Sequence, residues 1–567
     1  MKVAPALILD DIAARSQIEF GFARNLQASS VEGVGFAIRC GSAPRYETKC
    51  RAFLPSINDL ISIWVQDFRR PPNFVAKFDP HTIRVPSGHF IGGRLVPGAD
   101  RITVRRPSDN AVHAELPLAD ASTVEAAVQD AWHAWRTTDW ARRAPRDRAR
   151  VLRRWADLID ADVANMAPLE AVCSTRPLRD AVAWDVPFTA EGLRFFAEYA
   201  DKLGGDVAAT RHDNLGMVVA EPYGVVGAIT PWNFPLVMVS WKVGAALAAG
   251  NAVVLKPSEL TPYSAIRLAE LAIEAGVPPG LFNVVQGDGR TTGDALTRHP
   301  LISKMTFTGS TRTGSAIMAT CASHGPKPVT LELGGKSPQL VFDDTPDIDR
   351  LAGIVAGAIT GNAGQVCVAG SRLIVQRHIA QALIERITAR FAALRPGATW
   401  DDTATLPPII SQAQAGRILD IVERARDAGA QVRCGGGLFG DGPGGAYFQP
   451  TVLEGVRADN PAVQEEIFGP VLTVQTFDDE EEGLTLAAHE HYGLAAGVHT
   501  ADIGRALRAM RGIAAGTVWI NRYGRSADFV IPTGGYHQSG IGKDLGRQAV
   551  EANLRFKSVL IDFAATH

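Results

Sequence analysis

The chain has 567 residues, too many for one ordinary hydrophobic core, so two or three packed domains are expected. Hydrophobic residues make up 46% of it and charged residues 21%, which is the composition of a folded protein rather than a disordered one. Its 57 basic and 60 acidic residues give a net charge of −3, so the sequence predicts neither a nucleic-acid partner nor an anionic membrane partner.

The first 84 residues contain no motif that carries chemistry. The apolar stretch at residues 3–9 is too short for a secretory signal, and the acidic Asp10 and Asp11 argue against a transit peptide. Polar residues also interrupt the longest apolar region, residues 236–255, so no membrane span is expected. We interpret residues 1–84 as an N-terminal extension of unknown role.

The cysteines lack the spacing of a metal site or of a disulfide-rich domain. This usage favours a reducing cytoplasm as the location. His489 and His491 form the tightest histidine pair, and such a pair lies more often in a surface loop than at a metal. The sequence therefore predicts no metal site. The six cysteines are Cys40, Cys50, Cys173, Cys321, Cys367 and Cys434.

Regular secondary structure is expected from about Phe90 onward. Ser122 and Glu125 have the spacing of a capping box, which predicts the start of an amphipathic helix. From Gly224, short apolar runs alternate with helical segments, and a similar alternation extends from Gly334 to about residue 516. This pattern predicts an α/β protein with two domains, the first built on a doubly wound parallel sheet. Its expected strands are residues 225–229, 252–255, 282–285 and 304–307.

Several glycine-containing segments resemble nucleotide-binding motifs, although the glycines at residues 435–445 are most simply those of a flexible loop. Residues 287–293 resemble the dinucleotide fingerprint with one residue too many, and residues 334–337 resemble the end of a P-loop that lacks its first glycine. Residues 307–310 are better placed, because they end an expected strand and open a helix. The Ser310 hydroxyl and nearby N–H groups would then face a phosphate. An ordinary strand–helix turn explains these residues equally well.

Polar residues follow two expected strands of the first sheet. Asn233 lies between Pro231 and Pro235, so its amide would be rigid, as an oxyanion site requires. Lys256 and Glu259 follow the next strand, at the edge where open α/β sheets bind ligands, and could hold ribose hydroxyls. A solvated turn is the alternative interpretation of Lys256 and Glu259.

Two further residues are candidates for catalysis. Glu332 lies in an apolar, strand-like segment, where a carboxylate is costly unless it has a partner or a task. Cys367 is flanked by small residues that would let a ligand approach. A buried cysteine is more often a small hydrophobic residue than a nucleophile, so Cys367 alone is weak evidence.

Taken together and in this order, the motifs from about residue 90 to the end of the chain resemble those of the aldehyde dehydrogenase superfamily. So many signals in one order are very specific. They are Pro231-Trp232-Asn233-Phe234-Pro235, Lys256-Pro257-Ser258-Glu259, Phe307-Thr308-Gly309-Ser310, Leu331-Glu332-Leu333-Gly334-Gly335-Lys336, Gly364-Gln365-Val366-Cys367, Glu465-Glu466-Ile467-Phe468-Gly469-Pro470 and Gly534-Gly535-Tyr536.

The resemblance implies oxidation of a small-molecule aldehyde to its acid with NAD(P). Cys367 would be the nucleophile that forms a thiohemiacetal and then a thioester, with the oxyanion held by the Asn233 amide and the Cys367 backbone N–H. Glu332 would activate the water that hydrolyses the thioester. NAD is expected to be preferred, since Glu259 would repel the 2′-phosphate of NADP, although NADP is not excluded. The implied cofactor contacts are Trp232, Lys256, Glu259, Gly289, Gly309, Ser310, Gly314, Glu466 and Phe468.

The same resemblance implies a domain plan. Residues 85–204 and 224–334 would form the NAD-binding domain, and residues 335–535 the catalytic domain. A small β-ribbon from residues 205–223 and 552–565 would join chains into a homodimer or homotetramer. Removal of residues 1–84 is expected to leave a folded, active enzyme.

Two departures from the family pattern concern the substrate. Thr533 stands where the family usually has the phenylalanine of a Pro-Phe-Gly-Gly motif, which lines the aldehyde tunnel. The loop at residues 522–528 is unusually charged, which favours a polar or acidic substrate tail.

Two alternative functions were considered. In a CoA-acylating semialdehyde dehydrogenase a thiol would take the acyl group, and Glu332 argues against this because no water-activating base is needed there. A catalytically silent, cofactor-binding relative would be expected to lose the nucleophile, whereas Cys367, Glu332 and Asn233 are all present.

Overall fold

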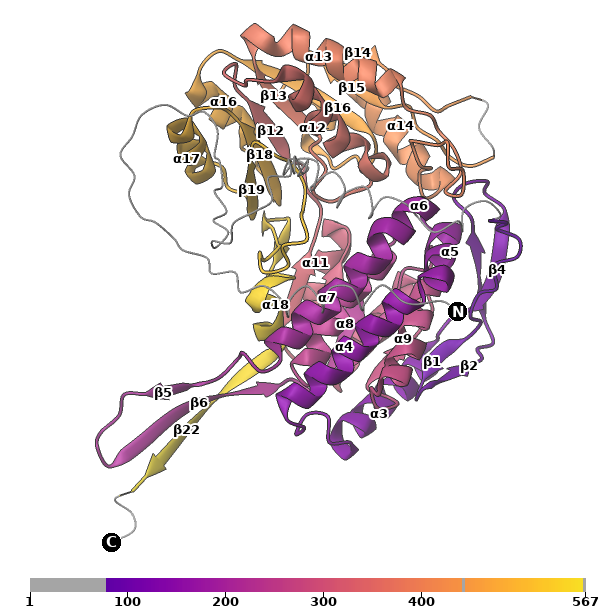
Figure 1. Cartoon of the computed structure of the whole chain (residues 1–567), viewed down its shortest axis with the longest axis vertical. Helices are drawn as coiled ribbons and strands as arrows, with labels where there is room; N and C mark the ends of the chain where they lie inside the picture. The colour runs from indigo at the N-terminus through magenta and orange to yellow at the C-terminus, as the bar shows by residue number, and fades with distance from the viewer. Residues whose placement is uncertain (1–77, 441–443, 564–567) are drawn as a thin grey trace, which may run out of the picture. The chain divides into compact units, whose positions relative to one another are not determined.

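The computed structural model describes residues 78–440 and 444–563. Cys40, Cys50 and most of the predicted N-terminal extension lie outside the described residues. The described part contains two large sheets with helices packed on them and a three-stranded ribbon (Figure 1). The expected fold class, an α/β protein with doubly wound parallel sheets, is confirmed.

The first sheet has eight strands. They are β1 (His89–Ile91), β2 (Arg94–Val96), β7 (Val225–Ile229), β8 (Ala252–Lys256), β9 (Phe282–Val284), β10 (Ile302–Thr308), β11 (Val329–Glu332) and β21 (Gly540–Ile541). Their order is β2-β1-β9-β8-β7-β10-β11-β21. The five strands β7 to β11 run parallel, so their carboxyl ends meet at one edge of the sheet, while β1, β2 and β21 are antiparallel additions.

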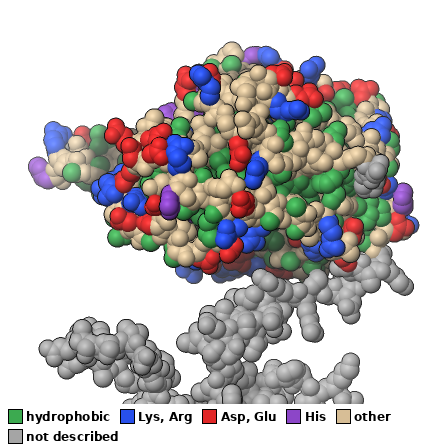
Figure 2. Space-filling model, turned by 90° about the horizontal axis from the view of Figure 1, so that it is seen from above, with side chains coloured by type: hydrophobic (Ala, Val, Ile, Leu, Met, Phe, Trp, Pro, Cys, Tyr) green, Lys and Arg blue, Asp and Glu red, His purple; other side chains and the backbone are tan. Residues whose placement is uncertain are grey.

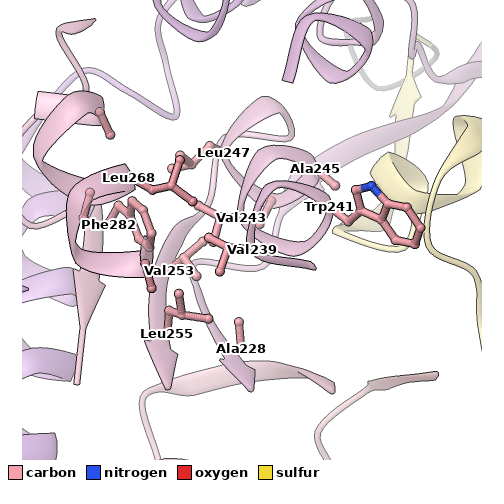
Figure 3. Close-up of a cluster of buried hydrophobic side chains, with 14 of the residues drawn as sticks. Ala228, Val239, Trp241, Val243, Ala245, Leu247, Val253, Leu255, Leu268 and Phe282 are labelled. Atoms are coloured by element: carbon pink, nitrogen blue, oxygen red, sulfur yellow. The ribbon is translucent and has the colours of Figure 1, made fainter. Parts of the chain in front are cut away.

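Helices cover this sheet, and their apolar faces form its core. In Figure 3, Val239 and Val243 of one helix lie beside Val253 and Leu255 of the sheet, and all four side chains are buried. The helices are α3 (Ala121–Thr137), α4 (Pro145–Ala161), α5 (Val163–Cys173), α6 (Leu178–Asp180), η3 (Ala181–Asp185), α7 (Val186–Tyr199), α8 (Pro235–Ala248), α9 (Tyr263–Ala275), η4 (Gly289–Gly293), α10 (Asp294–Arg298), α11 (Thr311–Ser323) and α18 (Gly546–Glu551).

The predicted start of the first helix was wrong. Asp120, not Ser122, caps α3, and its side chain accepts a hydrogen bond from the Thr123 N–H at 2.8 Å. A carboxylate at this position also interacts favourably with the helix dipole. Glu125 instead contacts Gln129 at 2.9 Å and His299 at 3.0 Å, so no capping box forms.

The second sheet has seven strands in the order β14-β15-β16-β13-β12-β18-β19. All neighbouring pairs are parallel except β14 with β15. Its strands are β12 (Pro338–Val341), β13 (Arg372–Gln376), β14 (Gln431–Cys434), β15 (Thr451–Glu454), β16 (Val471–Phe477), β18 (Ala495–His499) and β19 (Thr517–Ile520). Its helices are α12 (Ile348–Thr360), η5 (Gly361–Gly364), α13 (Arg377–Ala392), α14 (Gln412–Asp427), α15 (Pro461–Gln464), α16 (Glu480–Ala487) and α17 (Ile503–Gly512).

The chain also forms a separate antiparallel ribbon. It consists of β5 (Asp206–Ala208), β6 (Asn214–Pro222) and β22 (Leu554–Asp562), with β6 in the middle (Figure 1). Nine residue pairs join β6 to β22, so the end of the chain is tied to a segment more than 300 residues earlier. Two short antiparallel pairs complete the structure: β3 (Arg101–Arg105) with β4 (Val112–Pro117), and β17 (Tyr492–Gly493) with β20 (Tyr536–His537).

Part of the predicted extension packs against the folded body. The Phe78 ring lies 5.9 Å from that of Trp400, and Ile83 packs on a cluster that includes Val104 and Tyr263. A truncation after residue 84 would remove these contacts, whereas a truncation after residue 77 would keep them.

The described residues also allow the predictions about cysteines, membrane spans and metal sites to be compared with the structure. Cys173, Cys321, Cys367 and Cys434 are free thiols. Within residues 78–440 and 444–563, no helix combines the length and apolar character needed to cross a bilayer, and no cluster of His, Cys, Asp and Glu could hold a metal. On the face shown in Figure 2, basic and acidic side chains are intermixed. The cytoplasmic location stays a prediction.

Candidate active site

Asn233 is held in the turn between β7 and α8. Its side chain is only 6% exposed, and its Nδ2 donates to the Gln365 carbonyl at 3.0 Å. Asn362 Nδ2 in turn donates to the Asn233 carbonyl at 3.2 Å. Because an amide nitrogen has two N–H groups, the second one can donate to a substrate oxygen. Asn233 is therefore rigid and positioned by the loop that carries Cys367.

The loop that carries Cys367 follows α12 and is firmly anchored. Asn362 and Ala363 in its short helix η5 have φ values of 50° and 52°, an uncommon left-handed conformation for residues other than glycine. The Gln365 amide donates to the Pro408 carbonyl at 3.1 Å and accepts from the Ile410 N–H at 2.9 Å. These bonds hold the half-buried Cys367 in the wall of a cavity.

Glu332 ends β11 at the carboxyl edge of the first sheet. It is 7% exposed, and among the described residues its Oε1 has no hydrogen-bond partner. Burial raises the pKa of Glu332 to about 8, and the negative charge of Asp544 adds to this, while the positive charges of Lys242 and Arg525 oppose it. A carboxylate with a raised pKa and a free oxygen is suited to accept a proton.

A buried ion pair lies behind Glu332. Lys242 Nζ on α8 donates to Asp544 Oδ2 at 2.9 Å and to Thr306 Oγ1 at 3.1 Å. Asp544 also forms a backbone pair with Thr533, at 2.7 and 2.9 Å. The pair thus ties α8 to the segment that precedes α18 and fixes the charges that Glu332 experiences.

The thiol of Cys367 is protonated at neutral pH in this structure. Burial raises its pKa to about 12, the negative charges of Glu332 and Glu466 add to this, and Arg525 lowers it. A nucleophilic thiolate therefore requires that the thiol proton pass to a base when the aldehyde binds.

A cavity of about 590 Å³ connects Cys367 with the start of α11. Across it, Glu466 Oε1 accepts from the Gly335 N–H at 3.0 Å, and the Phe468 ring packs edge-on against Trp232 at 5.2 Å. Seven of the predicted site residues line the cavity: Trp232, Asn233, Gly309, Ser310, Cys367, Glu466 and Phe468.

Comparisons with known proteins identify the family of the chain. The model described as "Aldehyde dehydrogenase family" matches residues 96–559. The chain belongs to the aldehyde dehydrogenase family. The resemblance seen in the sequence is confirmed, and the protein is an oxidoreductase.

Its relatives match over nearly their whole length. The NADP/NAD-dependent aldehyde dehydrogenase PuuC of Escherichia coli (strain K12) is 39% identical over 479 residues, which is 84% of this chain and 96% of PuuC. An aldehyde dehydrogenase of Aspergillus niger is 40% identical over 480 residues, covering 84% and 95% of the two chains.

Solved structures of aldehyde dehydrogenases are similar as well. A mutant of the indole-3-acetaldehyde dehydrogenase AldA of P. syringae, in complex with NAD+ and IAA, has a TM-score of 0.83 at 39% identity and covers 85% of this chain and 98% of its own. The γ-glutamyl-γ-aminobutyraldehyde dehydrogenase of Burkholderia cenocepacia J2315 has a TM-score of 0.83 at 42% identity, with coverages of 85% and 98%.

In this aldehyde dehydrogenase, Ser310 caps α11. Its hydroxyl accepts from the Thr313 N–H at 3.3 Å, and Gly309 donates its N–H to the Glu332 carbonyl at 3.0 Å. A Cβ at Gly309 would lie 2.4 Å from the Phe307 ring, so glycine is required for this close turn. The N-terminus of α11 therefore faces the cavity with its free N–H groups.

Four predicted cofactor residues of the dehydrogenase lie outside the lining of this cavity. Lys256 Nζ donates to the carbonyls of Pro257 and Gly287, both at 2.8 Å, and to Glu259 Oε2 at 3.3 Å. Gly289 is exposed at the start of η4, where a Cβ would meet open space. At Gly314 a Cβ would lie 2.4 Å from Leu333, so this glycine serves the packing of α11.

Two residues that support the Glu466–Phe468 loop of the dehydrogenase were not predicted from the sequence. Gln414 Nε2 donates to the Phe468 carbonyl at 3.1 Å, and Arg417 Nη2 donates to the Glu466 carbonyl at 2.7 Å. Both residues lie on α14 and line the cavity together with Tyr492. Gln414 and Arg417 are three residues apart on a helix, and because this spacing is common it did not indicate that they support the site.

Proposed function

We propose that this dehydrogenase oxidises an aldehyde to its carboxylic acid with NAD, through a covalent intermediate on Cys367. The observation that supports this is that Cys367 and Asn233 line one cavity with the N-terminus of α11, while Glu332 lies buried close enough to Cys367 to change the pKa of its thiol. The test is a panel of aldehydes, with formation of NADH followed by absorbance and the acid identified as product.

In the first step the Cys367 sulfur bonds to the aldehyde carbon, and the thiol proton leaves to a base. The carbonyl oxygen becomes an oxyanion that accepts hydrogen bonds from the Asn233 amide and the Cys367 backbone N–H. Asn233 is held by Gln365, so its second N–H costs little reorganisation when the oxyanion forms.

The residues present fit a dinucleotide. The cavity offers free N–H groups at Ser310 for a pyrophosphate, and Trp232, Glu466 and Phe468 as walls near Cys367. Bound NAD would supply the hydride acceptor, and loss of a hydride from the carbon bonded to Cys367 leaves the thioester. Lys256 already uses its three N–H groups, so it would bind a ribose hydroxyl by exchanging its longest bond, the one to Glu259.

In the second step Glu332 removes a proton from water, and the water oxygen attacks the thioester carbon. The carbon–sulfur bond breaks, the acid leaves, and Cys367 regains its proton. The free Oε1 of Glu332 and its raised pKa suit this role.

Glu259 is proposed to set the preference for NAD. Its side chain is 42% exposed, so its repulsion of a 2′-phosphate is partly screened. Glu259→Gln is expected to narrow the ratio of kcat/KM for NAD over NADP by about tenfold. Steady-state kinetics with both cofactors checks this.

The matched control is Glu274→Gln, which removes the same charge from an exposed position on α9. It should leave the cofactor ratio unchanged. An equal ratio in the wild type and in Glu259→Gln would show that Glu259 does not discriminate between the two cofactors.

The ribbon is proposed to join chains into a dimer or tetramer. Phe556 and Leu560 are 59% and 69% exposed in the single chain and lie on one face of β22, and exposed apolar side chains on one face of a sheet favour burial against a partner. Leu560→Asp is expected to shift the assembly toward the 60.5 kDa monomer in analytical ultracentrifugation. Lys557→Ala on the opposite face is the control, and equal masses for all three proteins would contradict the proposal.

A further inference from the structure

The loop between β19 and the buried Thr533 brings a guanidinium to the catalytic centre. Arg525 is half-buried, its Cζ lies 5.4 Å from the centroid of the Trp241 ring, and its Nη2 donates to the Thr533 hydroxyl. The positive charge of Arg525 lowers the pKa of both Cys367 and Glu332. The guanidinium is therefore close to both residues that carry the chemistry.

Arg525 lacks the partner that a buried guanidinium normally has. Arg176, which also lies near the cavity, donates to Asp185 at 2.9 Å. In the part of the chain that the structure describes, no carboxylate forms such an ion pair with Arg525. The charges of Glu332 and Asp544 favour the guanidinium without an ion pair, and Asp544 is already paired with Lys242, so an anion from outside the chain would stabilise Arg525 further.

A second donor next to Arg525 is also unused. Trp241 is 6% exposed, and its Nε1 has no hydrogen-bond partner among the described residues. Figure 3 shows its indole apart from the aliphatic cluster of α8 and β8, on the side of the C-terminal segment. Trp241 thus offers a free donor beside the guanidinium of Arg525.

Aromatic side chains connect this point with the cavity of Cys367. Phe234 lines the cavity, and its ring lies 5.9 Å from that of Trp184. The Phe188 ring is 4.5 Å from Trp184 and 6.4 Å from Trp241. Trp184 is 39% exposed, so the cluster reaches the surface. Apolar rings therefore extend from the cavity of Cys367 to the indole that the guanidinium contacts.

We propose that Arg525 binds a carboxylate at the end of the substrate remote from the aldehyde carbon. The substrate class is then an ω-carboxylated aldehyde whose methylene chain lies against the aromatic cluster. The proposal rests on the proposed function, and it assigns the specificity of that site. Thr533 orients the guanidinium by accepting its hydrogen bond.

The charge at this point fits one carboxylate. A guanidinium presents two parallel N–H donors to a carboxylate, and one positive charge matches one negative charge. The other cations near Glu332 are already engaged: Lys242 pairs with Asp544, and Lys543 Nζ donates to the Gly534 carbonyl and lies 5.4 Å from the Tyr536 ring. A phosphate dianion would need a second free cation.

The test compares 5-oxopentanoate with pentanal, which differ in the remote carboxylate. The wild type should give a kcat/KM at least tenfold higher for 5-oxopentanoate. Arg525→Gln should lose about 10- to 100-fold more kcat/KM on 5-oxopentanoate than on pentanal, mainly through KM, while the loss on pentanal reports the charge that Arg525 places near Cys367 and Glu332. Arg525→Lys keeps the charge and should recover part of the loss. Arg522 is an exposed arginine of the same loop, and Arg522→Gln should leave kcat/KM unchanged for both substrates.

Two results would overturn the proposal. If Arg525→Gln slows both aldehydes equally, Arg525 acts on Cys367 and Glu332 instead of on the substrate tail. If the wild type shows no preference, the carboxylate is not recognised. Should no aldehyde be oxidised, the proposed function fails, and calorimetric titration with glutarate and pentanoate still tests Arg525. Glutarate binding that is lost in Arg525→Gln supports the proposal, and equal binding of both acids contradicts it.

Discussion

Replacing Cys367 by alanine is expected to abolish aldehyde oxidation, with a loss in kcat of at least about 10⁴-fold. The sulfur forms the covalent bond to the aldehyde carbon, and alanine offers no atom that can replace it. The substitution removes one atom from a loop that is held by Gln365 and Asn362, so the cavity should keep its shape. Binding of NAD, followed by calorimetry, should therefore change little.

The other described cysteines provide the controls. Cys173 and Cys321 are buried free thiols outside the cavity, and burial raises the pKa of each. Cys173→Ala and Cys321→Ala should keep their kcat, although each removes buried volume and lowers stability. If one of them were as damaging to the chemistry as Cys367→Ala, the assignment of the nucleophile would be wrong.

Replacing Glu332 by glutamine is expected to separate the two half-reactions. Glutamine keeps the shape of the side chain but cannot accept a proton from water. Loss of a positioned base costs on the order of 10²–10⁴ in rate. Stopped-flow absorbance should then show a burst of NADH followed by slow turnover. Loss of the burst together with turnover would mean that Glu332 is needed to ionise Cys367.

The pH dependence of turnover follows from the same carboxyl group. Its pKa is raised by burial and by Asp544 to about 8, so below that pH Glu332 is mostly protonated and cannot act as a base. Turnover limited by hydrolysis should rise as the pH increases through about 8, and Glu332→Gln should lack this rise. A wild-type profile that is flat between pH 7 and 9 would argue for another base, such as Glu466.

The local parts of the fold were predictable from the sequence. The expected strand at residues 225–229 matches β7, and the one at residues 252–255 differs from β8 by a single residue. The buried strands of a parallel sheet are continuous apolar runs, so their limits are visible in the sequence. The capping box failed because Ser122 and Asp120 both have suitable side chains, and spacing alone does not decide between them.

The supports of the site were not predictable. Lys242 and Asp544 are 302 residues apart, and the two sequence segments give no sign that they meet. Arg417 likewise reaches the Glu466 carbonyl from a helix 49 residues earlier. Such contacts depend on how elements pack, which local spacing does not encode. The charge of the loop around Arg525 was visible in the sequence, but its position against Trp241 required the structure.

Whether the acyl intermediate is bound to Cys367 can be measured by mass spectrometry of Glu332→Gln that is mixed with aldehyde and NAD and then quenched with acid. We expect an acyl group on the peptide that contains Cys367, with the mass of the aldehyde less two hydrogens, and only when NAD is present. An acyl group on another residue, or no covalent adduct during the burst of NADH, would contradict this expectation.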